Sequence, residues 1–300
     1  MSAPSITSRD WALILLLSII WGGAFFFNVV ALRGFPTNTL VFGRMAIATL
    51  PLLIIIMVSG QKLPRGWAAW RGLALLGALN IVVPIILFTW AQTQIASGVA
   101  SVLNATTPLW GVLAAHFLTH DEKATPMRVA GVLLGMAGVV VMALPDMGQG
   151  LTGQSLAIAA CLFSTLCFAL ASILARKLNI GGVTPMALTA GQLASSALIM
   201  LPIMLIVDQP WTLPMPSKES VLALVALALL STTFAYWLFF KVLESAGASN
   251  SLLITFLIPV TAILLGVLLL DEQVSLAQGG GIALIAAGLL VMDGRILRRG

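Results

Sequence analysis

Long apolar runs separated by short polar turns follow one another along the whole chain. Ten of these runs approach the ~20 residues that an α-helix needs to cross the hydrocarbon core of a bilayer. Most connecting turns are too short to hold a water-soluble domain. The pattern therefore predicts an all-α integral membrane protein with ten transmembrane helices. The ten runs are Trp11–Leu32, Thr39–Ser59, Leu73–Thr93, Ser97–Thr119, Thr125–Leu144, Gly153–Ala175, Thr184–Val207, Ser220–Leu243, Ala248–Leu270 and Leu276–Met292.

The second half of the chain repeats part of the first. The acidic turn Asp121-Glu122 returns 150 positions later as Asp271-Glu272. The correspondence extends to Gly131 with Gly281, Gly138 with Gly288, Val141-Met142 with Val291-Met292 and, one residue out of step, Pro108 with Pro259. A self-match at half the chain length indicates an internal duplication. We therefore expect two five-helix repeats, residues 1–147 and 148–300, within one membrane domain.

Composition supports a lipid environment. The chain is 60% hydrophobic and 8% charged, with a mean hydropathy of +1.08, whereas a soluble domain carries about 25% charged residues. The net charge of +5 does not indicate nucleic-acid binding, because the position of the charges along the chain explains it. Twelve of the fifteen Lys and Arg residues fall on one side of the predicted membrane.

The basic residues also set the orientation. Cytoplasmic loops are enriched in Lys and Arg, so both termini should be cytoplasmic. Five spans per repeat is an odd number, so the second repeat should enter the membrane inverted. Lys123 and Arg128 follow the first acidic turn, whereas no basic residue follows the second before Arg295. Inverted repeats allow two halves to rock around a midplane site and so give alternating access.

These residues resemble a known group of membrane proteins. Trp21-Gly22-Gly23, Arg44 and the two blocks built on Pro108 and Pro259 are similar to the EamA-type, ten-helix drug/metabolite transporter superfamily. Within it, the chain looks most like the YddG-type amino-acid exporters of bacterial inner membranes. The resemblance covers essentially the whole chain. It implies a multi-pass inner-membrane protein that exports amino acids, aromatic ones included, and related metabolites.

The resemblance also implies where a substrate would bind. The cavity of the family is lined near the central prolines, and the matching segments contain Phe88, Asn104, Thr107, Phe168 and Ser251. Phe234 and Trp237 are further candidates for an apolar wall, with lipid-facing packing as the alternative. Asn80 and Thr255 are polar candidates, for which interhelical hydrogen bonding is the alternative.

Prolines and glycines within the spans suggest how such a site could move and bind. Pro108 has no N–H, so the carbonyl of Asn104 loses its usual helical donor and could accept from the ammonium group of an amino acid. Pro84 and Pro259 could free carbonyls in the same way. These three prolines, with Gly98 and Gly247 at span ends, are also candidate hinges.

Arg44 is the one basic residue well inside a span, about 8 Å from its outer end at 1.5 Å per residue. It could reach the interface, or it could bind a substrate carboxylate or pair within the bundle. An intramembrane charge costs enough energy to suggest a functional role. Lys241 lies nearer the inner end, where its side chain can extend to the headgroups.

All ten acidic residues fall at span ends or in loops. A carboxylate at mid-membrane would be the expected proton relay, so the sequence favours uniport or exchange over carboxylate-coupled proton antiport. The same inventory argues against a membrane-embedded enzyme, which needs a nucleophile with a base or paired carboxylates. No metal or other cofactor is expected.

Two alternatives to amino-acid export remain at this point. A carrier for sugar phosphates or nucleotide sugars would need several buried Lys or Arg residues. A non-transporting membrane subunit would need no polar residues around central prolines. The expected partners are a small-molecule substrate and the bilayer, and a monomer of ten spans would suffice, although a dimer is compatible with the sequence.

Overall fold

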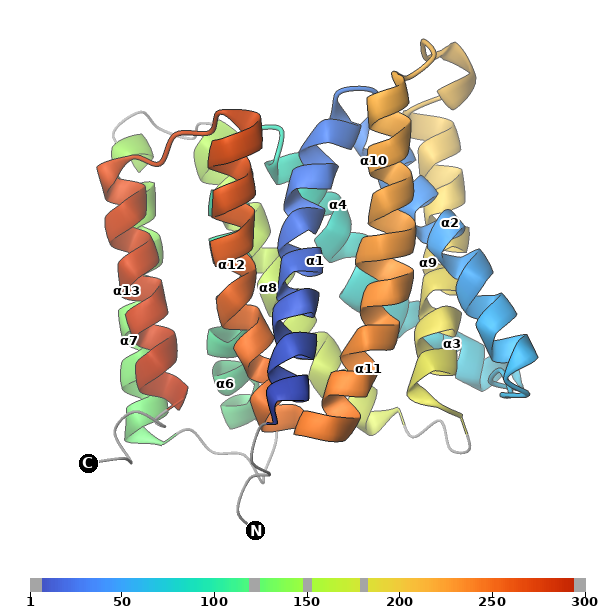
Figure 1. Ribbon diagram of the computed structural model, residues 1–300, viewed down its shortest axis with the longest axis horizontal. Helices are drawn as coiled ribbons and strands as arrows, with labels where there is room; N and C mark the ends of the chain where they lie inside the picture. The colour runs from blue at the N-terminus through green and yellow to red at the C-terminus, as the bar shows by residue number, and fades with distance from the viewer. Residues whose placement is uncertain (1–6, 119–124, 148–152, 179–182, 294–300) are drawn as a thin grey trace.

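The protein is a bundle of helices in the computed structural model, which describes residues 7–118, 125–147, 153–178 and 183–293. The bundle is drawn in Figure 1. Its elements are α1 (Ser8–Leu32), α2 (Thr37–Val58), α3 (Trp67–Gly77), η1 (Ala78–Val82), α4 (Val83–Ala91), α5 (Ser97–Asn104), α6 (Thr107–Leu118), α7 (Pro126–Met147), α8 (Gly153–Lys177), α9 (Pro185–Val207), η2 (Pro210–Thr212), α10 (Lys218–Ala228), η3 (Leu229–Phe234), α11 (Ala235–Ala246), α12 (Ala248–Leu270) and α13 (Leu276–Asp293). The described residues form no strand, which confirms the all-α prediction for them.

Eight helical stretches within the described residues are long and apolar enough to cross a membrane. Two further apolar helices are shorter, over Pro126–Met142 and Leu276–Met292. Each of the ten runs expected from the sequence coincides with helix, and nearly all of the predicted ends lie within a few residues of the observed ones. The structure therefore supports a multi-pass membrane protein, and the crossing of the bilayer by all ten runs stays a prediction.

Two of the spans contain a π-helical segment. In the first, η1 ends at Val82, two residues before Pro84, which has no N–H to continue the α-helical ladder. In the second, η3, the hydroxyls of Thr232 and Thr233 donate to the carbonyls of Leu227 and Ala228, five residues earlier, at 2.8 and 3.2 Å. Segments of this kind are frequent at functional sites, and both of these border the cavity described below.

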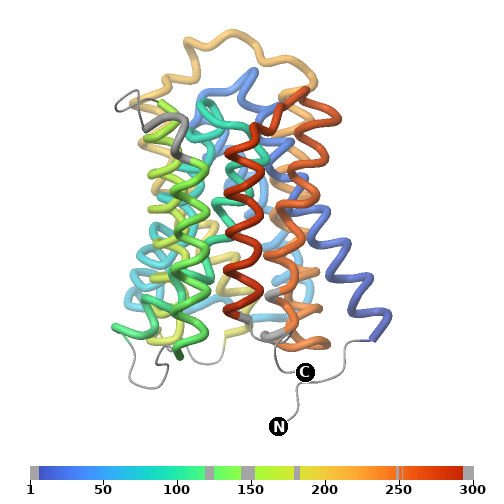
Figure 2. The backbone as a smooth tube through the Cα atoms, turned by 90° about the vertical axis from the view of Figure 1, so that its left-hand side faces the viewer, coloured from blue at the N-terminus to red at the C-terminus, as the bar shows by residue number. Residues whose placement is uncertain are grey.

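Helices α7 and α13 pack closely against each other along their length (Figures 1 and 2). Glycines make the close approach possible. A Cβ atom built on Gly288 would lie 2.5 Å from the backbone nitrogen of Gly135 and 2.6 Å from the carbonyl oxygen of Gly131. In lipid, small residues at a helix interface allow the van der Waals contact that holds the helices together.

Acidic side chains from the second half of the chain cap helices of the first half. The Glu272 carboxylate accepts hydrogen bonds from the backbone N–H of Ser97 at 2.7 Å, the Ser97 hydroxyl at 2.8 Å and the N–H of Gly98 at 3.3 Å, at the start of α5. Asp208 caps α2 similarly, accepting from the N–H and hydroxyl of Thr39 at 2.6 and 2.8 Å. Carboxylates stabilise helix N-termini through free N–H groups and the helix dipole.

We expect Glu272→Ala to destabilise the protein by about 2 kcal/mol, because it leaves the first N–H groups of α5 without their acceptor. The change should lower the Tm of the purified protein in detergent. Asp271→Asn is the matched control, because Asp271 is exposed and has a left-handed backbone that Asn also tolerates. Equal Tm values for the two variants would contradict the capping role.

Candidate functional site

A cavity of about 500 Å³ lies within the bundle. Its lining residues come from α1, α2, η1, α4, α5, α6, α8, α9, η3, α11 and α12. Both halves of the chain therefore contribute, whereas the α7–α13 pair does not. The volume falls in the range of about 300–1,000 Å³ typical of small-molecule sites.

The cavity brings together seven of the residues selected from the sequence. They are Arg44, Asn80, Phe88, Asn104, Thr107, Phe168 and Thr255. These side chains come from five different spans, so only the folded bundle places them together. The set combines one cation, two amides, two hydroxyls and two aromatic rings around a common space.

Three other candidates lie outside the cavity lining. Phe234 and Trp237 are each 39% exposed, their rings stack on each other with centroids 5.6 Å apart, and Trp237 lines a second pocket. Lys241 lies over the Trp237 ring, 5.6 Å from its centroid. Ser251 is buried and donates to the carbonyl of Gly247, four residues earlier on the chain. The residues of α11 that do line the cavity are its other aromatics, Tyr236 and Phe239.

Aromatic rings form much of the cavity wall. The Phe88 ring contacts Phe25 edge-on and lies parallel to Phe168, with centroids 6.3 Å apart in both pairs. A second group is built on Trp21, whose ring contacts Tyr236 at 6.4 Å and Phe239 at 5.5 Å. Such rings give an apolar surface on which an aliphatic or aromatic side chain of a substrate can pack.

Arg44 provides the positive charge of the cavity. Its Nε donates to the Thr232 hydroxyl at 3.0 Å, and Tyr236 is its electrostatic neighbour. No Asp or Glu is among the residues that line the cavity in the described part of the chain. The guanidinium thus has a neutral hydrogen-bond acceptor but no carboxylate among the described lining residues to balance its charge, which favours an anionic group on the substrate.

A buried amide network borders the cavity at one end of α1. The Asn28 side-chain N–H donates to the Gln92 amide oxygen at 2.8 Å, and the Gln92 N–H donates to the backbone carbonyl of Phe25 at 2.9 Å. The Thr89 hydroxyl donates to the Asn28 amide oxygen at 3.4 Å. Sequence reasoning missed Gln92, because a glutamine in the last turn of an apolar span resembles an interfacial residue. Its one-turn spacing from Thr89 and Phe88 was the available signal.

The five candidate hinge residues lie at interruptions and contacts of the spans. Pro84 follows η1, and Pro108 follows the break between α5 and α6. Gly247 joins α11 to α12 with φ +80°, Pro259 is inside α12, and Gly98 packs against Ile263 of α12. Their role as hinges stays a prediction.

The carbonyl of Asn104 has a partner that the sequence did not suggest. It accepts a hydrogen bond of 2.7 Å from the Thr107 hydroxyl. The hydroxyl therefore replaces the backbone donor that Pro108 lacks. A substrate ammonium group would have to share this carbonyl with the Thr107 hydroxyl, so other acceptors in the cavity are better placed to bind it.

Comparison with known proteins adds the family. The sequence model of the EamA-like transporter family matches residues 11–144 and again residues 155–292. The chain belongs to this family. The family assignment made from Trp21-Gly22-Gly23, Arg44 and the proline blocks is thereby confirmed at the family level.

Relatives of this EamA-family protein are named mostly as transporters. Protein PecM of Dickeya dadantii is 28% identical over 278 residues, covering 91% of this chain and 89% of PecM. The uncharacterized inner membrane transporter YedA of Escherichia coli K12 is 26% identical over 286 residues, covering 94% and 90%. A probable terminal-alkyne amino-acid exporter of Streptantibioticus cattleyicolor is 31% identical over 140 residues, 46% of each chain.

The fold is also shared with a solved structure. A crystal structure 20% identical in sequence superposes with a TM-score of 0.66 and covers 97% of this chain and 99% of its own. The family match, the relatives named as inner membrane transporters and the apolar helices together make this EamA-family protein a multi-pass inner-membrane transporter.

Proposed function

We propose that this transporter exports neutral amino acids, aromatic ones included, from the cytoplasm. The observation that carries the proposal is Arg44, a cation in the lining of a partly aromatic cavity whose described lining contains no carboxylate. A substrate carboxylate would supply the missing negative charge, and its side chain would pack on Phe88 and Phe168. The amino-acid exporter among the relatives and the YddG-type resemblance of the sequence point in the same direction.

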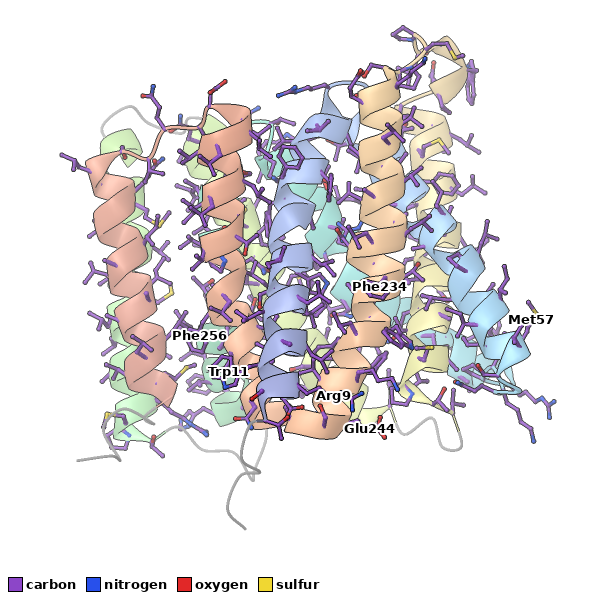
Figure 3. The ribbon with its side chains drawn as sticks, in the orientation of Figure 1. Arg9, Trp11, Met57, Phe234, Glu244 and Phe256 are labelled. Carbon is purple, nitrogen blue, oxygen red and sulfur yellow. The ribbon has the colours of Figure 1, made fainter. Side chains whose placement is uncertain are left out.

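We further propose that the chain acts by alternating access between two inverted five-helix repeats, residues 1–147 and 148–300, with both termini in the cytoplasm. The two matches of the family model, over residues 11–144 and 155–292, support two related halves. Figure 3 places Arg9 and Glu244 at the end of the bundle where α1 begins, which is also the end where α13 finishes (Figure 1). Ten spans would complete such a site within a monomer.

Transport by this mechanism would be uniport or exchange. A proton-coupled carrier needs a group that gains and loses a proton at membrane depth. The described lining of the cavity offers amides, hydroxyls and Arg44 for this task but no carboxylate and no histidine. The free energy for export would then come from the gradient of the substrate itself.

A carrier for sugar phosphates or nucleotide sugars is the second candidate, and the site supports it less. A phosphate dianion is normally held by several Lys or Arg residues. Arg44 is the single cation among the described lining residues. Lys241 borders a separate pocket of about 440 Å³ together with the acidic Glu244. A non-transporting subunit would have no use for a cavity of this size.

Counterflow in liposomes tests the proposal. Purified protein is reconstituted, the vesicles are loaded with an unlabelled compound, and entry of labelled phenylalanine is followed. Internal phenylalanine, methionine and threonine should stimulate entry, and a sugar phosphate or a nucleotide sugar should not. The rate should change by less than about twofold when a pH gradient is imposed, since no carboxylate relay is present. Stimulation by sugar phosphates alone would overturn amino-acid export, and a strict need for a pH gradient would overturn uniport and exchange.

A further inference from the structure

Helices α2 and α9 carry two residues in equivalent positions, Arg44 and Gln192, and only Arg44 has a role in the proposed function. Arg44 is the eighth residue of α2, and Gln192 is the eighth residue of α9. Each follows a glycine, and each precedes an apolar residue that lines the cavity, Met45 in one case and Leu193 in the other. The two helices pack against each other, so the two positions belong to one region of the bundle.

The surroundings of the two positions also match. Gly43, before Arg44, packs against Leu224 of α10, and Gly191, before Gln192, packs against Leu73 of α3; a Cβ atom would lie 3.0 and 2.7 Å away. Each leucine lies five residues before a π-helical segment, η3 in the first case and η1 in the second. Arg44 and Gln192 thus occupy equivalent positions in the two halves of the chain.

Each of the two side chains reaches a π-helical segment of the other half. Arg44 Nε donates to Thr232 of η3 at 3.0 Å, and Gln192 accepts at 3.3 Å from the side-chain N–H of Asn80 in η1. Arg44, Thr232 and Asn80 all line the cavity, and Gln192, which is not itself a lining residue, adjoins it through its hydrogen bond with Asn80. The cavity therefore has two related polar poles, each formed by α2 or α9 and the π-helical segment of the opposite half.

The two poles differ in what they can bind. A guanidinium has only donors, so the Arg44 pole accepts a carboxylate and repels an ammonium group. An amide pair carries oxygens that can accept from an ammonium group. In the Asn80–Gln192 pair, the Asn80 amide oxygen has no hydrogen bond within the described residues, and the Gln192 oxygen accepts one of the two that it can accept. Pro84 also has no N–H for the backbone carbonyl of Asn80, four residues earlier.

We propose that the Asn80–Gln192 pair binds the ammonium group of the substrate while Arg44 binds its carboxylate, and that Gln192 makes the site prefer a zwitterion to an anion without an ammonium group. A second arginine at position 192 would create two cationic poles, which suit an anion without an ammonium group. The glutamine therefore sets the preference for a zwitterion. This inference rests on the proposed function, because it assigns the two ends of an amino acid to the site.

Three probes with the same phenyl side chain test the inference by counterflow in liposomes. L-Phenylalanine carries both charged groups, 3-phenylpropionate lacks the ammonium, and 2-phenylethylamine lacks the carboxylate. Gln192→Arg should lower the rate ratio of phenylalanine to 3-phenylpropionate by about tenfold or more, since a charge-assisted hydrogen bond is replaced by repulsion. Gln192→Glu should raise the transport rate of 2-phenylethylamine relative to that of 3-phenylpropionate by a similar factor.

The matched control is Gln209→Arg, the same change at an exposed glutamine after α9, which should leave both ratios unchanged. Gln192→Glu introduces the opposite charge, so it tests the inference even where Gln192→Arg fails to yield folded protein by size-exclusion chromatography. Unchanged ratios in a folded Gln192 variant that transports phenylalanine would overturn the inference alone. A wild-type protein that transports none of the three probes would overturn the proposed function itself.

Discussion

Replacing Arg44 with glutamine is expected to reduce phenylalanine counterflow about 100-fold. Removing one partner of a desolvated charge pair costs roughly 2–5 kcal/mol, and about 3 kcal/mol corresponds to two orders of magnitude in binding. Glutamine can still donate to the Thr232 hydroxyl, which Arg44 contacts at 3.0 Å, so the cross-bundle contact has a neutral substitute. Arg44→Gln should therefore lower the transport rate and leave the stability of the fold nearly unchanged. Initial rates over a range of phenylalanine concentrations, measured alongside the Tm in detergent, separate the two.

Two companion variants give the Arg44 result its meaning. Arg44→Lys keeps the charge but loses the planar fork that binds a carboxylate through two donors, so an intermediate rate is expected. Arg71→Gln removes an exposed arginine near the start of α3 and should transport at the wild-type rate. Arg44→Gln protein that is folded and transports phenylalanine normally would exclude the guanidinium as the carboxylate partner.

Arg44 shows which part of the site the sequence can predict. A charged residue in the middle of an apolar span is rarely there for structural reasons alone, because burying an unpaired charge in the membrane costs free energy. The cavity does contain Arg44, with Asn80, Asn104 and Thr107. These four residues are polar within apolar spans, so composition alone makes them conspicuous. The long helices are predictable for the same reason, since an apolar run of about 20 residues has few other uses.

Helix α11 shows which part it cannot predict. Tyr236 and Phe239 line the cavity, whereas Phe234 and Trp237 do not and are exposed. In water, the outward face of a helix is polar, and the periodicity reveals the inward one. In lipid, both faces are apolar, so the sequence does not distinguish an aromatic residue that lines a cavity from one that faces the hydrocarbon. The choice depends on how neighbouring helices pack.

The π-helical segments were hidden from sequence reasoning for a related reason. The Thr232 and Thr233 hydroxyls donate to carbonyls five residues earlier in their own helix, and the Thr233 hydroxyl also lies 3.1 Å from the carbonyl of Ala48 on α2. Thr232 also accepts a hydrogen bond from Arg44 of the other half. A propensity or a hydrophobic pattern carries no signal for a wider turn of this kind, whereas Pro84 marks the other segment plainly.

The second large effect is expected at the α7–α13 interface, where Gly288→Ala should destabilise the fold by about 1–3 kcal/mol. The added methyl group would meet backbone atoms of Gly131 and Gly135 at 2.5–2.9 Å, and no flexible side chain is present there to move away. The two helices would have to separate along a contact that in lipid depends on close packing. Thermal unfolding of the purified protein in detergent, followed by circular dichroism, measures the loss.

The control for this prediction lies on the same helix. Gly279 is also within α13, but a Cβ atom built there has no neighbour within 4 Å. Alanine has a helix propensity about 1 kcal/mol better than that of glycine, so Gly279→Ala should raise the Tm slightly or leave it unchanged. The same substitution is thus expected to lower the Tm at Gly288 and not to lower it at Gly279, nine residues earlier. Equal Tm changes would show that the α7–α13 contact contributes little to stability, and that the glycines shared by the two halves of the sequence are kept for another reason.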